Sequence, residues 1–429
     1  MDKNRIRIII EKLGRVVNSE IELAPLMIFS GESGMGKSYL ALLAHYFYDV
    51  LIISDRNPRL PHLFEYLNYD YKEMAKSFKG EGVALTITKQ EIEKWMETDA
   101  VNYLRFMLNS ERLEGRIKVS LPSAIPDTIV FNYKEEFSGL VNNEDVDLVL
   151  GINEIGYRIS HSAINDTTPY AAVLSAFLIS CLFGDFYALR STFNMPPSRG
   201  PVLSENVIGN SGMYKDFIAD VNDLSNVPSN PKLTSAPLLK QLFTVMEGEV
   251  KKEDNRLMYH TTNGVSMPVS AAAASIREIA PLQILASKWD ISRTAILIEE
   301  PEAHLHPSKQ RMMADVVGHI CKAGAHVHLT THSDYFLQRI NELIMFQTYI
   351  DNHKQDQEAI ESIKSKTGIS PEFSINADDV LAYLVLRQED GSSKVVPQEM
   401  MHGVPFTSFS EAVREAMRVG DILEEALGL

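Results

Sequence analysis

A glycine-rich segment near the N-terminus constrains the fold of this chain more than any other feature. It runs Gly31-Glu32-Ser33-Gly34-Met35-Gly36-Lys37-Ser38 and fits GxxxxGK[ST] at every fixed position. The apolar stretch Leu26–Phe29 before it predicts a buried strand, and Tyr39–Ala44 after it predicts the start of a helix. A strand, a glycine-rich loop and a helix in this order predict an α/β fold whose loop wraps phosphate groups.

The residue types in this loop suit the chemistry of a nucleotide. Its glycines allow consecutive backbone N–H groups to point at phosphates, and the helix N-terminus adds a partial positive charge. We expect Lys37 to reach the β- and γ-phosphates and Ser38 to bind Mg²⁺. The simpler alternative is a glycine-rich turn that fits the pattern by chance. The complete match between a strand and a helix, together with a second motif, argues against that alternative.

The second motif is a pair of carboxylates, Glu299 and Glu300, which follows the apolar run Ala295–Ile298. Such runs are typical of strands buried on both faces of a parallel sheet, so we expect this strand near the strand of the glycine-rich loop. There, Glu299 would bind Mg²⁺ or its waters, and Glu300 would act as general base or position the attacking water. A solvated turn is the ordinary alternative for two adjacent glutamates, and the phosphate loop upstream disfavours it.

A β-α-β unit follows from the next residues. Ser308–Lys322 has apolar residues at helical spacing, and Ala325–Ser333 predicts another strand. His332 lies at the end of that strand, where it could donate a hydrogen bond to the γ-phosphate and sense hydrolysis. A lone histidine is more often structural, but its place one strand after the carboxylates favours a functional interpretation. His304 and His306 are more typical of structural or interfacial histidines than of a transition-metal site.

Together, these motifs resemble those of ATP-binding-cassette (ABC) ATPases of the structural-maintenance-of-chromosomes (SMC) type. More narrowly, they resemble predicted ATPases related to the overcoming-lysogenization-defect proteins. The resemblance rests on the phosphate loop (P-loop), Ile298–Pro307 and Thr330–Ser333, and it covers about Ile6–Phe47 and Met267–Asn341. It implies a P-loop ABC-ATPase head, with a mixed or parallel sheet flanked by helices, that binds ATP and Mg²⁺ and hydrolyses ATP.

The resemblance also assigns roles to individual residues. Glu300 corresponds to the catalytic carboxylate, Glu302–His304 to the D-loop and His332 to the switch histidine. Hydrolysis in this family takes place at a head-to-tail dimer interface, where a signature loop of one subunit closes the phosphate site of the other. The resemblance therefore implies a homodimer or a higher homo-oligomer formed through the ATPase heads.

The candidate signature loop is Val269–Glu278, in which Ser270 or Ser275 would contact phosphate. Related sequences tend to carry a Ser-Ser-Gly-like core, whereas this chain has Ala273-Ala274-Ser275. This departure predicts slow turnover or a modified interface. An alanine-rich helix start that only packs on the core is an equally open interpretation.

A further segment, Phe193–Gly200, is similar to a Pro-Ala-Ser-Arg segment of the same ATPases. Arg199 could approach a phosphate or the subunit interface, because its planar guanidinium suits anionic oxygens. A solvent-exposed arginine in a turn is the alternative.

Composition limits the partners that this chain can have. Its 57 acidic and 41 basic residues give a net charge of −16, which disfavours broad attraction to DNA. Two cysteines, Cys181 and Cys321, give no disulfide framework. The longest apolar stretch, Ala171–Gly184, is shorter than the roughly 18 to 20 residues that span a bilayer, and no secretory signal is evident. We therefore expect a cytoplasmic protein with no membrane contact; a local basic groove for DNA stays open.

The motifs also suggest how the chain is divided. We expect one part of the ATPase head at 1–55, a mostly helical insertion at 56–235, the second part of the head at 236–345 and a C-terminal extension at 346–429. Within the insertion, Gln90–Leu108 and Pro169–Phe193 predict helices, whereas Ile129–Tyr133 and Leu148–Ile152 predict strands. No sustained heptads indicate a coiled-coil arm. Asn226–Pro237 predicts a loop.

The C-terminal region lacks the acidic pattern of a fused Toprim nuclease, because Asp378 and Asp379 do not alternate as two carboxylates on one face of a strand would. A capping box at Ser408–Glu411 predicts a final helix. The family resemblance implies the ATPase or sensor subunit of a bacterial anti-phage defence system, with a separate nuclease or toxin as effector. Two alternatives stay open: a DNA-repair ATPase of the recombination type, and a scaffold that binds ATP with little turnover.

Overall fold

The computed structural model describes residues 5–53, 58–69, 78–137, 146–160, 168–200, 211–228, 235–254, 256–398, 417–419 and 422. The predicted final helix, whose capping box begins at Ser408, lies largely outside these residues.

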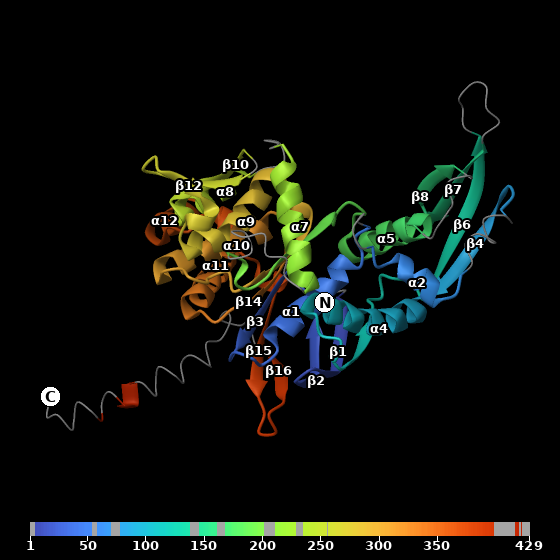
Figure 1. Cartoon of the computed structure of the whole chain (residues 1–429), viewed down its shortest axis with the longest axis horizontal. Helices are drawn as coiled ribbons and strands as arrows, with labels where there is room; N and C mark the ends of the chain where they lie inside the picture. The colour runs from blue at the N-terminus through green and yellow to red at the C-terminus, as the bar shows by residue number, and fades with distance from the viewer. Residues whose placement is uncertain are drawn as a thin grey trace.

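A mixed sheet, nine-stranded within the described residues, forms the centre of the molecule (Figure 1). Its strands lie in the spatial order β5 (Gly115–Ser120), β1 (Arg7–Leu13), β2 (Val16–Glu22), β16 (Ser393–Pro397), β15 (Val380–Arg387), β3 (Leu26–Gly31), β14 (His326–Thr330), β13 (Thr294–Glu299) and β9 (Ser191–Met195). The strands from β15 to β9 are all parallel, whereas β1 runs antiparallel to both of its neighbours. The carboxyl ends of β3, β14 and β13 therefore meet at one edge of the sheet, and these ends carry the three sequence motifs.

Helices cover both faces of this sheet, which confirms the predicted α/β class with helices flanking a mixed sheet. On one face lie α1 (Lys37–Asp49) and α4 (Lys89–Leu108), and the same hydrophobic cluster continues into α2 (Pro61–Tyr66) and α5 (Thr168–Phe183), which packs on a smaller sheet. On the other lie α7 (Gly212–Asn226), α8 (Ala236–Met246), α9 (Ala274–Lys288), α10 (Pro307–Lys322), α11 (Asp334–Asn352) and α12 (Gln357–Thr367).

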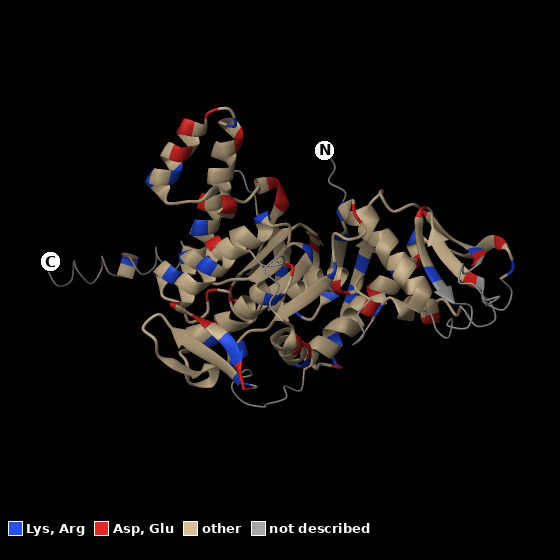
Figure 2. Ribbon diagram, turned by 90° about the horizontal axis from the view of Figure 1, so that it is seen from above, with Lys and Arg blue, Asp and Glu red and all other residues tan. Residues whose placement is uncertain are grey.

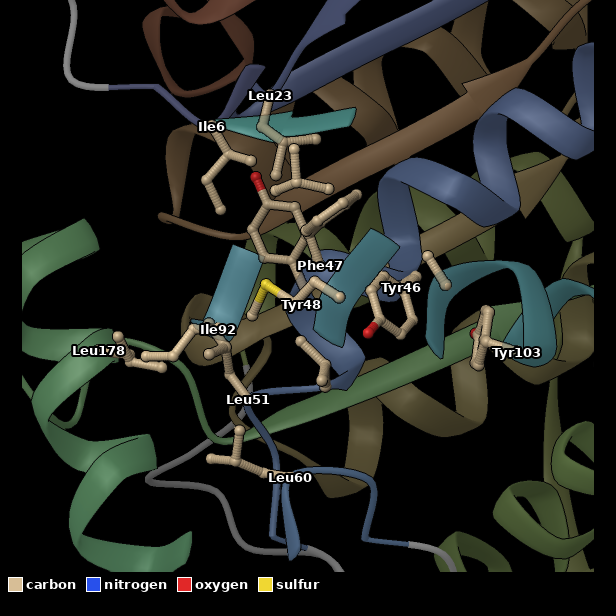
Figure 3. Packing of buried hydrophobic residues seen from close by; sticks show 14 of the residues in the cluster. Ile6, Leu23, Tyr46, Phe47, Tyr48, Leu51, Leu60, Ile92, Tyr103 and Leu178 are labelled. Carbon is tan, nitrogen blue, oxygen red and sulfur yellow. The ribbon is translucent and has the colours of Figure 1, made fainter. Parts of the chain in front are cut away.

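The alternation of side chains along the central strands divides the interior into two hydrophobic clusters. Met27 and Phe29 of β3 join the first cluster, whereas Leu26 and Ile28 join the second. Because successive side chains of a strand point to opposite faces, a strand buried on both faces reads as a continuous apolar run. Figure 3 shows the first cluster, in which residues of α1, α4 and α5 pack together.

The segment between the two halves of the site holds more strand than the sequence predicts. A four-stranded antiparallel sheet, in the order β4 (Glu81–Thr88), β6 (Thr128–Phe137), β7 (Val146–Ile152) and β8 (Ile155–Ser160), lies at the end of the molecule remote from α8 to α12 (Figure 1). The predicted strands correspond to β6 and β7. The added β4 alternates between exposed and buried residues only in part, so its sequence gives a weak strand pattern. A small third sheet consists of β10 (Gly248–Glu253), β11 (Arg256–Thr261) and β12 (Ser266–Pro268).

The predicted helix at Pro169–Phe193 is too long. Helix α5 ends at Phe183, because Gly184 adopts a φ of +82° that a right-handed helix does not allow. Residues 191–195 instead form β9, which pairs in parallel with β13.

The sheets also divide the chain differently from the ranges expected from the motifs. Strands β5 and β9 come from the range expected for the insertion, yet both belong to the central sheet. Strand β15 comes from the range expected for the C-terminal extension, and it pairs directly with β3. Hydrogen bonds between strands join segments that are distant in sequence, so motif spacing does not mark these boundaries.

Candidate functional site

The P-loop connects the carboxyl end of β3 to the first turn of α1. Gly31 ends β3 with a φ of +124°, and a Cβ there would lie 2.4 Å from the carbonyl oxygen of Val385 on β15. Gly36 adopts a φ of +103° just before α1, where a Cβ would lie 2.8 Å from Val16 Cγ2. These φ values and close approaches disfavour any side chain. The loop geometry therefore requires both glycines that the motif fixes, and Gly34 between them also has a positive φ, of +75°.

The ammonium group of Lys37 is folded back onto this loop. Its Nζ donates hydrogen bonds to the carbonyl oxygens of Gly31, at 2.9 Å, and of Glu32, at 2.7 Å. Burial lowers the pKa of Lys37 from 10.5 to about 8, although the nearby carboxylates of Glu300 and Glu299 oppose this effect. Phosphate oxygens are strong acceptors for a desolvated ammonium, so they would compete with the two carbonyls for Lys37.

Glu299 joins the end of β13 to the P-loop. Its Oε2 accepts a hydrogen bond from Ser38 Oγ at 2.5 Å and another from Thr330 Oγ1 at 3.3 Å. The residue is 3% exposed, and burial raises the pKa of its carboxyl group from 4.5. Its other oxygen, Oε1, is buried with no hydrogen-bond partner among the described residues. Glu299 therefore holds an unsatisfied oxygen next to the hydroxyl group of the P-loop serine.

Glu300 and His332 lie at the ends of neighbouring strands. Glu300 has a φ of +48°, and its N–H donates to the carbonyl oxygen of Thr330 at 3.1 Å. Its side chain is 43% exposed, and its Oε1 lies 3.7 Å from His332 Nε2. Burial and the charge of Lys37 lower the pKa of His332 from 6.5, although the carboxylate of Glu300 opposes this effect. The sparsely populated backbone conformation of Glu300 is maintained by its surroundings, as is common at functional sites.

Glu302 supports the residues that follow β14. Its Oε1 accepts hydrogen bonds from Thr331 Oγ1 and from the backbone N–H of His332, both at 2.7 Å. The side chain is buried, and burial raises the pKa of its carboxyl group. Of the predicted D-loop Glu302–His304, the glutamate thus fixes the backbone of the candidate switch histidine.

A cavity of about 410 Å³ lies between these elements. The structure brings most of the predicted residues to its wall: Ser33, Gly34, Gly36, Lys37, Ser38, Glu299, Glu300 and His332. Three other residues of the motif do not line it. Gly31 lies at the end of β3 against the backbone of Val385. Glu32 is exposed, with its carboxylate 3.6 Å from Arg387 Nε, and Met35 is buried with its sulfur 3.7 Å from Ser393 Oγ.

The motifs do not predict four further residues that line the cavity, namely Gly14, Arg15, Tyr39 and Thr330. Thr330 ends β14 two residues before His332, and this position is the sequence signal that could have identified it as a residue of the cavity. Gly14 and Arg15 form the turn between β1 and β2, which nothing in the local sequence distinguishes from an ordinary hairpin. Tyr39 follows the motif directly and packs against this turn, since a Cβ on Gly14 would lie 2.6 Å from Tyr39 Cε2.

Ser270 and Ser275 do not line this cavity. Ser270 is exposed within the short 3₁₀ helix Val269–Ala271, and Ser275 is half-buried in the first turn of α9. Ala273 precedes α9 and provides no side-chain cap. The two serines of the candidate signature loop therefore do not contribute to the cavity of their own chain.

Arg199 is buried, so neither contact with phosphate nor an exposed turn describes it. It is 2% exposed, and its Nε donates to the carbonyl oxygen of Glu278 at 2.7 Å. Its Nη1 donates to the carbonyl oxygens of Pro196, at 3.1 Å, and Glu299, at 2.9 Å. The carboxylate of Glu278 lies 3.5 Å from Nε and balances its charge.

The site suits Mg²⁺ better than a transition metal. Across the described ranges, no group of three or more His, Cys, Asp or Glu side chains is placed to hold a metal ion. The hydroxyl group of Ser38 and the unsatisfied Oε1 of Glu299 are instead oxygen donors. Mg²⁺ binds through one or two such protein groups, phosphate oxygens and waters. Separately, no described helix is long and apolar enough to cross a membrane.

Comparison with known proteins supports a nucleotide-binding role. Residues 214–337 match the family described as the AAA ATPase domain. This range includes Glu299, Glu300 and His332 and covers fewer than half of the 429 residues. No curated protein matches the sequence. The family match and the P-loop geometry together support an ATP-binding ATPase.

Three solved structures of SMC head domains are similar at low scores. An SMC head bound to the C-terminal winged-helix domain of ScpA is 11% identical, with a TM-score of 0.41, and covers 93% of this chain and 98% of its own. The head domain from Thermotoga maritima is 11% identical, with a TM-score of 0.33 and coverages of 92% and 99%. A head domain with an extended coiled coil, bound to the C-terminal domain of ScpA from Pyrococcus furiosus, is 9% identical, with a TM-score of 0.38 and coverages of 98% and 99%. Similarity at this level does not establish the type of ATPase.

Proposed function

We propose that this protein is an ABC-type ATPase that hydrolyses ATP with Mg²⁺ and uses Glu300 as its catalytic carboxylate. One observation carries the proposal: the 2.5 Å hydrogen bond between Ser38 Oγ and Glu299 Oε2. This contact places the end of β13 against the P-loop. Glu300 and the P-loop residues therefore line the same cavity.

Binding of ATP would use groups that are already in place. The P-loop backbone and the start of α1 would hold the phosphates, and Lys37 would exchange its two carbonyl partners for phosphate oxygens. Ser38 and Glu299 would hold Mg²⁺, which when bound neutralises phosphate charge during the transfer. Mg²⁺ would give the buried Oε1 of Glu299 a partner. This favours the Mg²⁺-bound state, because a buried polar atom without a partner is costly.

Hydrolysis requires a group that orients or deprotonates the attacking water. The carboxylate of Glu300 is partly exposed and lines the cavity, so a water can reach it. His332 stands 3.7 Å away on the neighbouring strand end. A neutral imidazole carries one N–H, so His332 can donate a single hydrogen bond, which we assign to the phosphate. Glu302 fixes the backbone of His332, so these three residues form one connected arrangement.

Replacement of Glu300 tests the catalytic assignment. Glu300→Gln keeps the shape of the side chain but removes the base, so we expect kcat to fall by about 10² to 10⁴. ATP affinity should stay within a few-fold, because Lys37 and Ser38 are unchanged. Glu361→Gln is the matched control, since Glu361 lies on the exposed face of α12, paired only with Lys364 in the described contacts. Unchanged hydrolysis by Glu300→Gln would disprove the assignment.

The placement of the candidate signature loop bears on oligomerisation. Ser270 is exposed and lies outside the cavity of its own chain, which supports a role in a neighbouring copy. We therefore extend the proposal to a head-to-tail homodimer in which this loop closes the phosphate site in trans. Activity per chain should rise with protein concentration until the dimer saturates. Full activity per chain over a range of concentrations in which the protein stays monomeric would contradict this part of the proposal.

The narrower biological role rests on family analogy alone. In this role the protein is the sensor ATPase of a bacterial anti-phage defence system, and it controls a separate effector protein. Charge supports a protein partner over DNA, since the chain is strongly acidic and basic residues are interspersed with acidic ones in Figure 2. Affinity purification of Glu300→Gln with ATP, with and without nuclease treatment, distinguishes the two. A stoichiometric nuclease or toxin supports the effector role, whereas bound DNA alone supports a DNA-repair ATPase.

A scaffold that binds ATP with little turnover is the second candidate function. It is favoured by the Ala273-Ala274-Ser275 sequence, which lacks the Ser-Ser-Gly-like core. ATP would then stabilise the fold or the dimer. The scaffold would be supported if the protein binds ATP and its slow turnover does not increase at any protein concentration.

A further inference from the structure

We propose that Arg199 is a positioning residue that couples the exposed loop before α9 to the catalytic carboxylates. The coupled loop consists of Val269–Ala273, which we call the α9 loop. The inference deepens the proposed function and rests on it, because it concerns how Glu300 is held and regulated.

Arg199 is the common donor to three segments that are far apart in sequence. It binds Pro196 in the loop after β9, Glu278 in α9 and Glu299 at the end of β13, in each case through a backbone carbonyl oxygen at 2.7 to 3.1 Å. The bond to Glu299 holds the peptide group that links this residue to Glu300. A shift of the guanidinium group would therefore move the backbone that carries the proposed catalytic carboxylate.

The ion pair with Glu278 fixes Arg199 to α9. Glu278 is 3% exposed and its Oε2 lies 3.5 Å from Arg199 Nε. Its Oε1 accepts a hydrogen bond from the backbone N–H of Gly200 at 3.0 Å. Because both charges are buried, separation of the pair would leave an unpaired charge in a nonpolar interior. Arg199 and α9 should therefore move together.

The backbone around this junction is held in unusual conformations. Ser198, directly before Arg199, has a φ of +51°, and Glu300 has a φ of +48°. The hydroxyl group of Tyr214 on α7 donates to the carbonyl oxygen of Pro197 at 2.6 Å and fixes the same loop. Non-glycine residues keep positive φ values only where surrounding contacts impose them, and such sites are typical of functional junctions. Arg199 supplies the contact that joins the two strained positions.

The α9 loop is the exposed end of this connection. Ser270, Ala271 and Ala273 are exposed, whereas Glu278, one turn into α9, is buried against Arg199. A second copy that contacts the loop can displace α9, and the displacement would reach the Glu299–Glu300 peptide through the guanidinium group. Arginine is suited to this role because its planar fork holds several acceptors in fixed directions, which lysine cannot do with one ammonium group.

The test is Arg199→Lys, which keeps the charge and removes the fork. We expect kcat to fall about tenfold or more, because a small misplacement of a catalytic group has effects of this size. The dissociation constant for ATP should stay within about threefold of wild type, since no P-loop contact changes. Arg339→Lys is the matched control: Arg339 forms a buried pair with Asp315 at 2.7 Å, so this variant should lose stability and keep its kcat.

A second measurement does not depend on turnover. Hydrogen exchange of residues 269–278 is compared with and without ATP in the Glu300→Gln background, in which nucleotide binds without being hydrolysed. We expect ATP to change protection of the α9 loop when Arg199 is present and not in Arg199→Lys. If that variant fails to fold, Glu278→Gln removes the charged partner while an amide oxygen can still accept the Gly200 N–H, and a reduced response is expected.

The outcomes separate the inference from the proposed function. Wild-type kcat and an intact exchange response in Arg199→Lys would overturn the inference. So would a loss of kcat that Arg339→Lys shares, since the effect would then reflect stability alone. A wild-type protein that binds ATP without hydrolysing it would refute the proposed function, and the exchange response would still test the coupling.

Discussion

Lys37 gives the sharpest quantitative prediction, because its ammonium group is buried before any phosphate arrives. Burial lowers its pKa from 10.5 to about 8. That difference corresponds to a net penalty of roughly 3 kcal/mol on the charged form, after the opposing effect of the nearby carboxylates, and phosphate oxygens can relieve it. Binding of ATP should therefore raise the pKa of Lys37 again. A base whose pKa rises on binding takes up a proton, so ATP affinity should fall as pH rises above 8.

The expected proton uptake follows from the fraction of Lys37 that is already charged. With a pKa of about 8, the free protein is about nine-tenths protonated at pH 7 and about one-quarter protonated at pH 8.5. Uptake on ATP binding should thus be about 0.1 proton per site at pH 7 and about 0.8 at pH 8.5. As pH rises from 7 to 8.5, ATP affinity should fall more and more steeply, and the slope approaches tenfold per pH unit as Lys37 becomes neutral.

Calorimetry of ATP binding in buffers with different ionisation enthalpies measures this uptake. Metal-free ATP with a chelator keeps Mg²⁺ away from the carboxylate of Glu299. Lys37→Arg is the matched control, since arginine keeps its proton throughout this range and should take up none at Lys37's position. Uptake that stays flat from pH 7 to 9, or an identical profile in Lys37→Arg, would refute the reasoning.

Two further predictions concern stability. Gly31→Ala should lower the free energy of unfolding by about 3 kcal/mol or more, because it combines a positive φ with a Cβ 2.4 Å from the Val385 carbonyl oxygen. Gly34→Ala also has a positive φ, but its Cβ would meet open space, so this variant should lose about 1 kcal/mol. Urea denaturation compares the two variants, and equal losses would contradict the steric argument. Burial raises the pKa of Glu299, so the folded state keeps a proton that the unfolded state has lost, and stability falls as pH rises above 4.5. Glu299→Gln removes this penalty and should raise the melting temperature of the nucleotide-free protein at pH 7. It should also remove the extra rise that Mg²⁺ adds to that of ATP alone. A lower melting temperature of the nucleotide-free variant would contradict this.

The sequence predicts the parts of the fold that depend on local patterns. Strands β3 and β13 are short apolar runs, and the helices α4 and α10 begin and end close to the residues where the sequence pattern places them. Their order along the chain was enough to place Lys37, Glu299 and His332 at one sheet edge, because parallel strands share the side on which they end. The residues that make up most of the cavity follow from that rule.

Residues held by distant contacts were harder to predict. Arg199 follows a Pro-Pro turn, and nothing near it indicates the buried Glu278 that lies 79 positions along the chain. Thr330 looks like an ordinary strand residue until its hydroxyl group meets Glu299. The predicted helix included the start of β9 because the apolar run of α5 was extended beyond Gly184, and the mixed sequence of β9, Ser191–Met195, has no clear strand pattern. Each of these features depends on tertiary contacts, which single-sequence patterns do not contain.

Strand β15 shows how far the phosphate site depends on such contacts. The carbonyl oxygen of Val385 on this strand lies against Gly31, which is the reason that the first glycine of the P-loop has no room for a side chain. Residues 26–31 of β3 pair with residues 380–385 of β15 along their whole length. The last strands of the described chain are therefore part of the nucleotide-binding sheet, although their sequence lies far beyond every motif. A division of this chain after His332 would keep all the recognisable motifs and remove the strand against which the P-loop is built.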